Sequence, residues 1–304
     1  MTDNLRGALF MMASMATFTL NDACIKWLAQ GLPTFQVVAL RGVAATLLIA
    51  VLAHATGALR RPIPRADWPW VAGRALAEVA AFLPFVLALT HMPLANITAI
   101  LQALPLSITA AGALFLGERV GWRRWTAIVI GLVGVLMIVR PGTADFDAWS
   151  LVALLTVAII TLRDLLTRRL SRDVPSLKVA IFTAAGVTVV GLAGAAGAPL
   201  RPVDAGQGAL LLAAALFVLG GYLFSILAMR CGEIAVVTPF RYTAMLWGLL
   251  LGALVFGERP DAWTLAGAGI VVATGLYTLW RETRAGASPA AAAARPAAPR
   301  THRP

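Results

Sequence analysis

Residues 112–119 read Gly-Ala-Leu-Phe-Leu-Gly-Glu-Arg, and residues 252–259 read Gly-Ala-Leu-Val-Phe-Gly-Glu-Arg. Six of these eight positions are identical, and the two glutamates, Glu118 and Glu258, lie 258 − 118 = 140 residues apart. Chance matches of Ala, Gly and Leu are common in apolar sequence, but the shared Gly-Glu-Arg includes charged residues that membranes rarely permit. The match therefore indicates an internal repeat.

The repeat also covers the start of each half. Residues 19–22 read Thr-Leu-Asn-Asp and are followed by Lys26, while residues 161–164 read Thr-Leu-Arg-Asp and are followed by Arg168. Here the offset is 164 − 22 = 142 residues, close to that of the first match. Two matches at nearly the same offset indicate that most of the chain is duplicated.

The composition excludes an ordinary soluble domain. Of the 304 residues, 60% are hydrophobic and 13% are charged, and the mean hydropathy is +0.82. Soluble domains are about 45–50% apolar and about 25% charged. Continuous apolar runs of about 20 residues predict helices that span the bilayer, and the dyad alternation of a membrane strand is absent from the sequence.

Ten such runs predict an all-α integral membrane protein with ten transmembrane helices. They lie at about 7–27, 34–54, 68–90, 93–116, 124–140, 149–168, 176–197, 208–229, 234–256 and 262–281. We expect residues 1–140 and 149–281 to form two five-helix repeats. Residues 282–304, which are rich in Pro, Ala and Arg, predict a disordered cytoplasmic tail.

The positive charges predict the orientation, because Lys and Arg in short loops stay on the cytoplasmic side. With the N-terminus inside, fourteen Lys and Arg residues fall inside and only Lys26, Arg140, Arg201 and Arg259 fall outside. We therefore expect both termini to be cytoplasmic and the protein to lie in the inner membrane. Five spans are an odd number, so the second repeat should enter the bilayer inverted relative to the first. Inverted repeats are typical of secondary transporters.

The sequence resembles the ten-helix EamA-type transporters of the drug/metabolite transporter superfamily, over about residues 5–281. The motifs that carry the resemblance are Gly117-Glu118-Arg119 before Gly131-x-x-Gly134, Gly257-Glu258-Arg259 before Gly267-x-Gly269, and Ala39-Leu40-Arg41-Gly42. The resemblance implies that a small organic solute crosses through a central cavity between the halves. It leaves the solute unnamed. It also implies that the fifth and tenth spans form the scaffold or dimer side, so both a monomer and a homodimer are open.

Charged and polar residues within the spans are the candidate substrate-binding residues, because a charge at the bilayer centre costs about 2.5–3.5 kcal/mol. They are Arg41, Glu78, Gln102, Arg241 and Tyr242. With a rise of about 1.5 Å per residue, Glu78 and Gln102 lie near the middle of their spans, Arg41 about 10 Å below the outer surface, and Arg241 and Tyr242 about a third of the way along the ninth span. We expect them to converge on one cavity. The alternative is that structural ion pairs, Arg41 with Asp22 and Arg74 with Glu78, only tie helices together.

Other acidic residues suggest further roles. Asp22 and Asp164 occupy matching positions of the two repeats and are candidate gate or helix-pairing residues, with Lys26 and Arg168 as partners. Glu118 and Glu258 end helices at the membrane surface, where we expect them to stabilise turns. Glu78 is the candidate proton carrier, since a buried carboxylate can bind and release a proton.

These features favour a secondary transporter that exports an anionic or zwitterionic metabolite, such as an amino acid, by alternating access, with protons as a candidate coupling ion. A metabolite or vitamin uptake carrier, or an uncoupled facilitator, of the same fold is the main alternative. An intramembrane enzyme or a channel is a remote one, because catalytic motifs and a filter sequence are lacking. We expect no cofactor, metal or nucleic acid. His54, His91 and His302 are isolated, and the sequence has no phosphate-binding loop.

Overall fold

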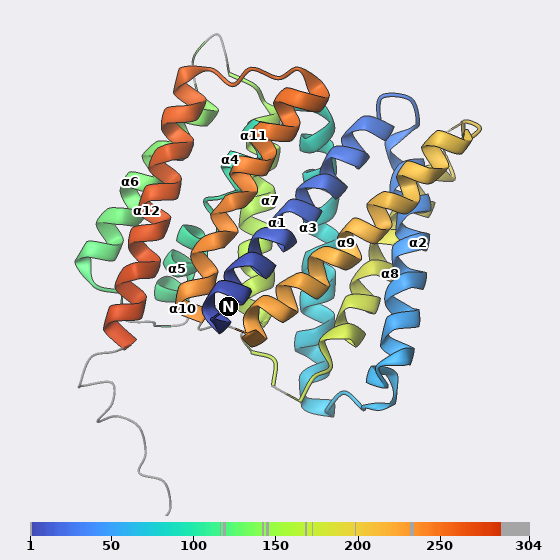
Figure 1. Ribbon diagram of the computed structural model, residues 1–304, viewed down its shortest axis with the longest axis horizontal. Coiled ribbons are helices and arrows are strands. Elements are labelled where there is room, and N and C mark those ends of the chain that lie inside the picture. The colour runs from blue at the N-terminus through green and yellow to red at the C-terminus, as the bar shows by residue number, and fades with distance from the viewer. Residues whose placement is uncertain are drawn as a thin grey trace, which may run out of the picture.

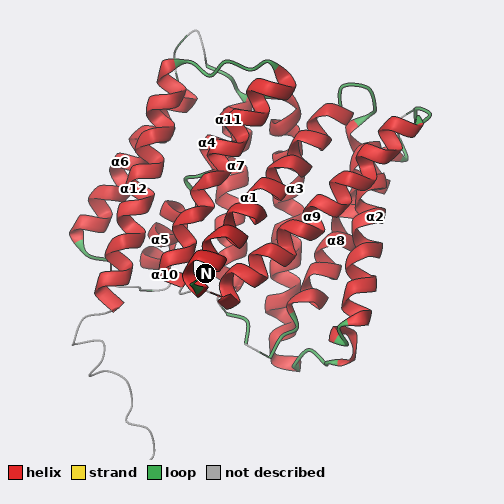
Figure 2. Cartoon of the chain, in the orientation of Figure 1, coloured by secondary structure: helices red, strands yellow, loops and turns green. Residues whose placement is uncertain are grey.

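The computed structural model describes residues 2–115, 117, 120–141, 143, 146–167, 169–171, 173–197, 199–231 and 234–286, with side chains except at 229–231, 234–235 and 282–286. Within these ranges ten helical segments are long and apolar enough to cross a membrane, and no strand occurs (Figure 2). The predicted all-α, ten-span architecture is confirmed. The predicted tail begins with residues 282–286, which continue the last helix, and otherwise lies outside the described residues.

The helices follow the predicted spans within a few residues. In the first half they are α1 (Asp3–Leu28), α2 (Thr34–Ala55), α3 (Trp68–His91), α4 (Leu94–Leu101), α5 (Leu104–Phe115) and α6 (Trp122–Val139). In the second half they are α7 (Trp149–Thr167), α8 (Ser176–Ala195), α9 (Ala205–Cys231), α10 (Ile234–Val237), α11 (Thr243–Phe256) and α12 (Ala262–Gly286). Two 3-10 turns, Ala58–Arg60 and Arg65–Asp67, connect α2 to α3.

The principal packing partners come from opposite halves of the chain. Helix α1 packs along α9, α3 along α7, α2 along α8, and α6 along α12. Figure 1 shows α6 and α12 side by side at one edge of the bundle, with α2 and α8 at the opposite edge. In the predicted repeat, α1 corresponds to α7 and α3 corresponds to α9. The α1–α9 pair of helices is therefore the counterpart of the α7–α3 pair, and both pairs are in contact.

Glycines bring α6 and α12 into backbone contact. A Cβ atom on Gly134 would lie 2.8 Å from the carbonyl oxygen of Gly267, and one on Gly267 would lie 2.5 Å from the carbonyl oxygen of Gly134. Real Cβ atoms do not approach that closely, so only glycine permits this crossing. The small residues of the fifth and tenth spans are thus used for packing within one chain.

The fourth and ninth spans are both interrupted, each after a short first helix. Helix α4 ends at Leu101 and α5 begins at Leu104. Pro105 lacks the N–H that would bond to the carbonyl of Leu101, which favours a break here. In the ninth span a 3-10 segment, Thr238–Tyr242, separates α10 from α11. At the repeat offset of 140, this segment corresponds to residues 98–102 and thus ends at the position of Gln102.

Candidate functional site

A cavity of about 360 Å³ lies among the central turns of eight spans. Residues of α1, α2, α3, α4, α5, α7, α8, α9, the 3-10 segment and α11 line it, whereas none of its described lining residues comes from α6 or α12. The five predicted substrate-binding residues all line this cavity, as expected: Arg41, Glu78, Gln102, Arg241 and Tyr242. Asp22 lines it as well, and Asp164 does not.

The two helix interruptions contribute three of these side chains. Gln102, at the break between α4 and α5, is only 7% exposed, and its Nε2 has no hydrogen-bond partner among the described residues. Arg241, in the 3-10 segment near the start of the ninth span, is exposed although it lies inside the bundle; since it lines the cavity, the cavity is where its side chain is accessible. In the part of the chain that the structure describes, Arg241 makes no salt bridge and no side-chain hydrogen bond.

Tyr242 is buried beside Arg241 and is positioned by α12. A Cβ atom on Gly275 would lie 1.6 Å from the Tyr242 hydroxyl oxygen, so a glycine is needed there to admit the phenol. Helix α12 therefore contributes space for a cavity side chain although it does not line the cavity itself.

Arg41 reaches Asp22 only through a third residue. Its Nε donates to Oδ1 of Asn21 at 3.0 Å, and Nδ2 of Asn21 donates to Oδ1 of Asp22 at 2.9 Å. The Arg41 guanidinium carbon also lies 5.8 Å from the ring centroid of Phe82. The direct Arg41–Asp22 ion pair considered from the sequence is therefore wrong, because the Asn21 amide lies between the two charges.

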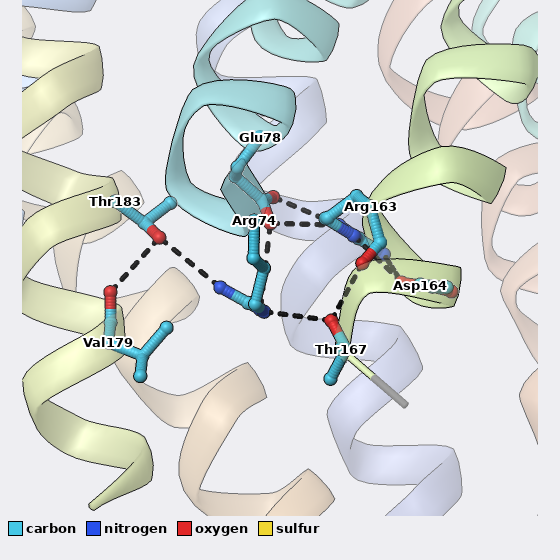
Figure 3. Close-up of polar contacts among 7 residues, drawn as sticks. All are labelled: Arg74, Glu78, Arg163, Asp164, Thr167, Val179 and Thr183. Carbon is cyan, nitrogen blue, oxygen red and sulfur yellow. Dashed lines mark hydrogen bonds and ion pairs between the residues drawn. The ribbon is translucent and has the colours of Figure 1, made fainter. Parts of the chain in front are cut away.

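Glu78 lies within a network of charged and hydroxyl side chains that joins α3, α7 and α8 (Figure 3). Nη1 of Arg163 donates to both Glu78 carboxylate oxygens at 3.0 Å, and Nη2 of Arg74 lies 3.7 Å from Oε2. Arg74 also donates to the hydroxyls of Thr167 and Thr183 at 3.1 and 3.3 Å. The Arg74–Glu78 pair expected from the sequence is present, but the stronger partner of Glu78 is Arg163.

Arg163 is the main residue that the sequence reasoning missed. It lines the cavity and holds Asp164 through Nε at 2.8 Å and Nη2 at 2.7 Å. The available signal was the mismatch within the repeat, where Arg163 stands at the position that Asn21 occupies in the first half. In the structure this additional charge of the second copy has two partners, Glu78 and Asp164.

The structure agrees with some of the predicted turn and ion-pair residues and disagrees with others. Glu258 lies at a turn as predicted, and its carboxylate pairs with Lys26 at 2.9 Å. The expected Asp22–Lys26 pair is therefore wrong, because Lys26 is engaged by Glu258 and by the carbonyl oxygen of Met92. Glu118 and Arg168, the corresponding residues of the other repeat, lie outside the described residues.

Among the described residues, ten apolar spans, eight of which line a cavity with charged side chains, have the architecture of a multi-pass membrane transporter. The chain belongs to the EamA-like transporter family, whose model matches residues 5–140 and 147–280. Small-metabolite transport, as export or as uptake, is the function that this family and the relatives below share. The predicted membership of the drug/metabolite transporter superfamily is confirmed.

The chain is similar to several curated transporters. It is 26% identical over 267 residues to the pseudopaline exporter CntI of Pseudomonas aeruginosa, covering 88% of this chain and 93% of that protein. It is 23% identical over 287 residues to an S-adenosylmethionine uptake transporter of Rickettsia prowazekii, with 92% and 94% covered. It is 28% identical over 229 residues to a riboflavin transporter of Rhizobium johnstonii, with 74% and 75% covered.

A solved crystal structure has the same fold. At 18% sequence identity it superposes with a TM-score of 0.62, covering 93% of this chain and 99% of its own. The likeness is one of backbone architecture.

Proposed function

We propose that this protein is a secondary transporter that exports a small organic solute bearing a carboxylate, anionic or zwitterionic, by alternating access between its two halves. The observation that carries the proposal is that Arg241 and Gln102, one from each interrupted span, line the same cavity, and that neither the Arg241 guanidinium nor the Gln102 Nε2 has a hydrogen-bond partner among the described residues. Arg41, Glu78 and Tyr242 complete the proposed binding set.

The hydrogen-bond donors of Arg241 and Gln102 favour a solute that carries a hydrogen-bond acceptor. A buried amide N–H₂ without a partner costs about 1–3 kcal/mol, and an unpaired guanidinium in a membrane interior costs more. A solute carboxylate offers two acceptor oxygens and a charge, so it can relieve both costs in one contact. This arrangement also fits the general rule that discontinuous helices at corresponding places of two repeats form the binding sites of secondary transporters.

The remainder of the cavity is suited to the organic part of the solute. The rings of Phe18, Phe82, Phe85 and Tyr222 all line it, and Phe18 and Tyr222 are in edge-to-face contact with centroids 5.4 Å apart. Its volume of about 360 Å³ falls within the ~300–1,000 Å³ of typical small-molecule sites. We infer that the charged end of the solute lies toward Arg241 and Gln102 while its apolar part contacts these rings.

The membrane topology supports this proposal through the sequence. The excess of Lys and Arg on one side favours two cytoplasmic termini and insertion in the inner membrane, and five spans per half favour inverted repeats. Export is the proposed direction, with uptake of the same solute and its uncoupled facilitation as the alternatives. Both a monomer and a homodimer can carry out this cycle, because the cavity is formed within one chain.

The test is solute exchange by the purified protein in liposomes. The labelled probes are S-adenosylmethionine and L-glutamate, which carry carboxylates, and riboflavin, which carries none. We expect saturable exchange of a carboxylate-bearing probe and an apparent affinity at least tenfold weaker in Arg241→Leu. Arg123→Leu, at the start of α6 outside the cavity, is the matched control and should exchange normally. Non-saturating flux would indicate a pore, and an unchanged affinity in Arg241→Leu would contradict the proposed site.

A further inference from the structure

Asp22 and Asp164 occupy equivalent positions of the two repeats but differ in their neighbours. The residue before Asp22 is Asn21, whereas the residue before Asp164 is Arg163. The two equivalent aspartate carboxylates therefore have different neighbours within one protein, and these neighbours determine how well each negative charge is compensated.

The Asp164 carboxylate is neutralised locally. Arg163 contacts its Oδ1 with both Nε and Nη2, at 2.8 and 2.7 Å, and Asp164 does not line the cavity. A charge-assisted contact of this kind favours the ionised carboxylate. Asp164 is thus a paired charge in the wall of the bundle.

The Asp22 carboxylate lines the cavity, and its negative charge is compensated less than that of Asp164. It accepts one hydrogen bond, from Nδ2 of Asn21 to Oδ1 at 2.9 Å, and no salt bridge reaches it among the described residues. Arg41, the cation on the neighbouring helix α2, is bound to Asn21 instead. A partly buried carboxylate held by a neutral amide gains more from binding a proton than one held by a guanidinium.

Glu78, the proton carrier expected from the sequence, resembles Asp164 in this respect. Both of its oxygens accept hydrogen bonds from Arg163, and Arg74 lies beside it. Protonation of Glu78 would remove the negative charge that both guanidinium groups contact, leaving Arg163 with Asp164 alone and Arg74 with two neutral hydroxyls. The network thus opposes the change of charge that a proton carrier must undergo.

We propose that Asp22, rather than Glu78, takes up and releases the proton that couples transport to a proton gradient. This inference rests on the transport function proposed above. The Asp22 carboxylate binds one proton when the cavity is open to the more acidic side, and the Asp22 carboxylic acid releases it when the cavity is open to the other side. Asn21 positions Asp22 and keeps the Arg41 guanidinium from pairing with it.

The setting of Asp22 includes charged and titratable groups on several elements. On its own helix these are Cys24 and Lys26, and across the cavity they are Arg41 of α2, Glu78 of α3, Arg163 of α7, Tyr222 of α9, and Arg241 and Tyr242 of the 3-10 segment. Of these, Glu78 and Arg163 bind each other and Lys26 binds Glu258. Protonation of Asp22 therefore changes the charge of the cavity without breaking any ion pair among the described residues.

A spectroscopic test needs no knowledge of the solute. Infrared difference spectra of the full-length protein in liposomes, taken from alkaline to acidic buffer, report the carbonyl stretch of each carboxyl group that becomes protonated. We expect a band that Asp22→Asn removes and that Asp164→Asn, the matched control, retains. Asn21→Arg should also remove it, because it gives Asp22 the partner that Asp164 has. A band that persists in Asp22→Asn and disappears in Glu78→Gln would overturn the inference.

A transport test separates coupling from exchange. With a probe that the wild-type protein exchanges, the ratio of gradient-driven accumulation to exchange rate is measured for each variant. Asp22→Asn should lose accumulation and retain exchange, while Asp164→Asn should keep the ratio of the wild type at whatever rate it retains. Equal losses of accumulation and exchange in Asp22→Asn would contradict the inference. Wild-type exchange without accumulation would refute coupling and leave the proposed transport function intact, whereas no exchange of any probe would refute that function.

Discussion

The carboxylate of Glu258, in the turn after α11, caps the N-terminus of helix α4 at Leu94. Its Oε1 accepts a hydrogen bond from the backbone N–H of Leu94 at 2.8 Å, and its Oε2 accepts one from Ala95 at 3.3 Å. Helix α4 leads from this cap to Gln102 in the cavity. A residue in a connecting turn of the second half thus fixes the short helix that positions a cavity residue of the first half.

Replacing Glu258 should therefore destabilise the protein. The side chains of Glu258 and Lys26 are each only 11% exposed, and removing one partner of a buried ion pair costs about 3–5 kcal/mol. We expect Glu258→Ala to lower the free energy of unfolding by that amount, measured by denaturant titration in detergent. Asp261→Ala is the comparison, because Asp261 is 52% exposed, pairs with Arg140 and caps α12 by accepting the Thr264 N–H at 2.8 Å. An exposed pair contributes about 0–1 kcal/mol and an N-cap about 0.5–2 kcal/mol, so this change should cost less. Equal effects of the two changes would show that the Glu258 contacts stabilise the protein no more than an exposed pair with a cap does.

Gln102 should show opposite effects on stability and on transport. Its Nε2 is buried without a described partner, so Gln102→Leu removes an unsatisfied donor and should leave the unfolding free energy unchanged or raised. The same change should weaken the apparent affinity for a carboxylate-bearing solute about tenfold, the equivalent of one hydrogen bond of ~1.4 kcal/mol. Both quantities are measured on one preparation, by thermal unfolding and by exchange in liposomes. A less stable variant with unchanged affinity would show that Gln102 has a structural role.

Arg163 and Glu78 should be energetically coupled. Arg163→Leu leaves Glu78 and Asp164 without their guanidinium partner, and we expect it to cost about 3–5 kcal/mol of unfolding free energy. The double variant Arg163→Leu/Glu78→Gln should be more stable than the sum of the single changes predicts, by about 0.5–3 kcal/mol. A double-mutant cycle on unfolding free energies measures this term. Strict additivity would mean that the 3.0 Å contacts contribute nothing to stability.

The crossing of α6 and α12 should tolerate no side chain at Gly134. The Cβ atom of Gly134→Ala would meet the Gly267 carbonyl oxygen at 2.8 Å, and overpacking of this kind costs about 1–3 kcal/mol. Gly269→Ala is the matched control on α12, because nothing lies within 4 Å of its added Cβ, and it should be neutral or stabilising by up to about 1 kcal/mol. Thermal unfolding compares the two, and similar melting temperatures would argue against the close crossing.

Much of the fold could be predicted because it depends on properties that are local in the sequence. An apolar run of about 20 residues must satisfy its own backbone hydrogen bonds in lipid, so it becomes a helix whatever its neighbours are. Depth follows from the helical rise, which is why Arg41, Glu78, Gln102, Arg241 and Tyr242 could be expected inside the bundle, and they do line one cavity. Their role in binding a solute stays a prediction.

Only the tertiary structure decided which charges meet. Sequence position gives the depth of a side chain, but its partner depends on the rotation and crossing of helices that are distant in the chain. Thus Asn21 lies between Arg41 and Asp22, Lys26 binds Glu258 rather than Asp22, and Arg163 binds Glu78. Each of these contacts depends on atoms within about 3 Å of one another, a precision that a one-dimensional pattern of apolar and polar residues does not contain.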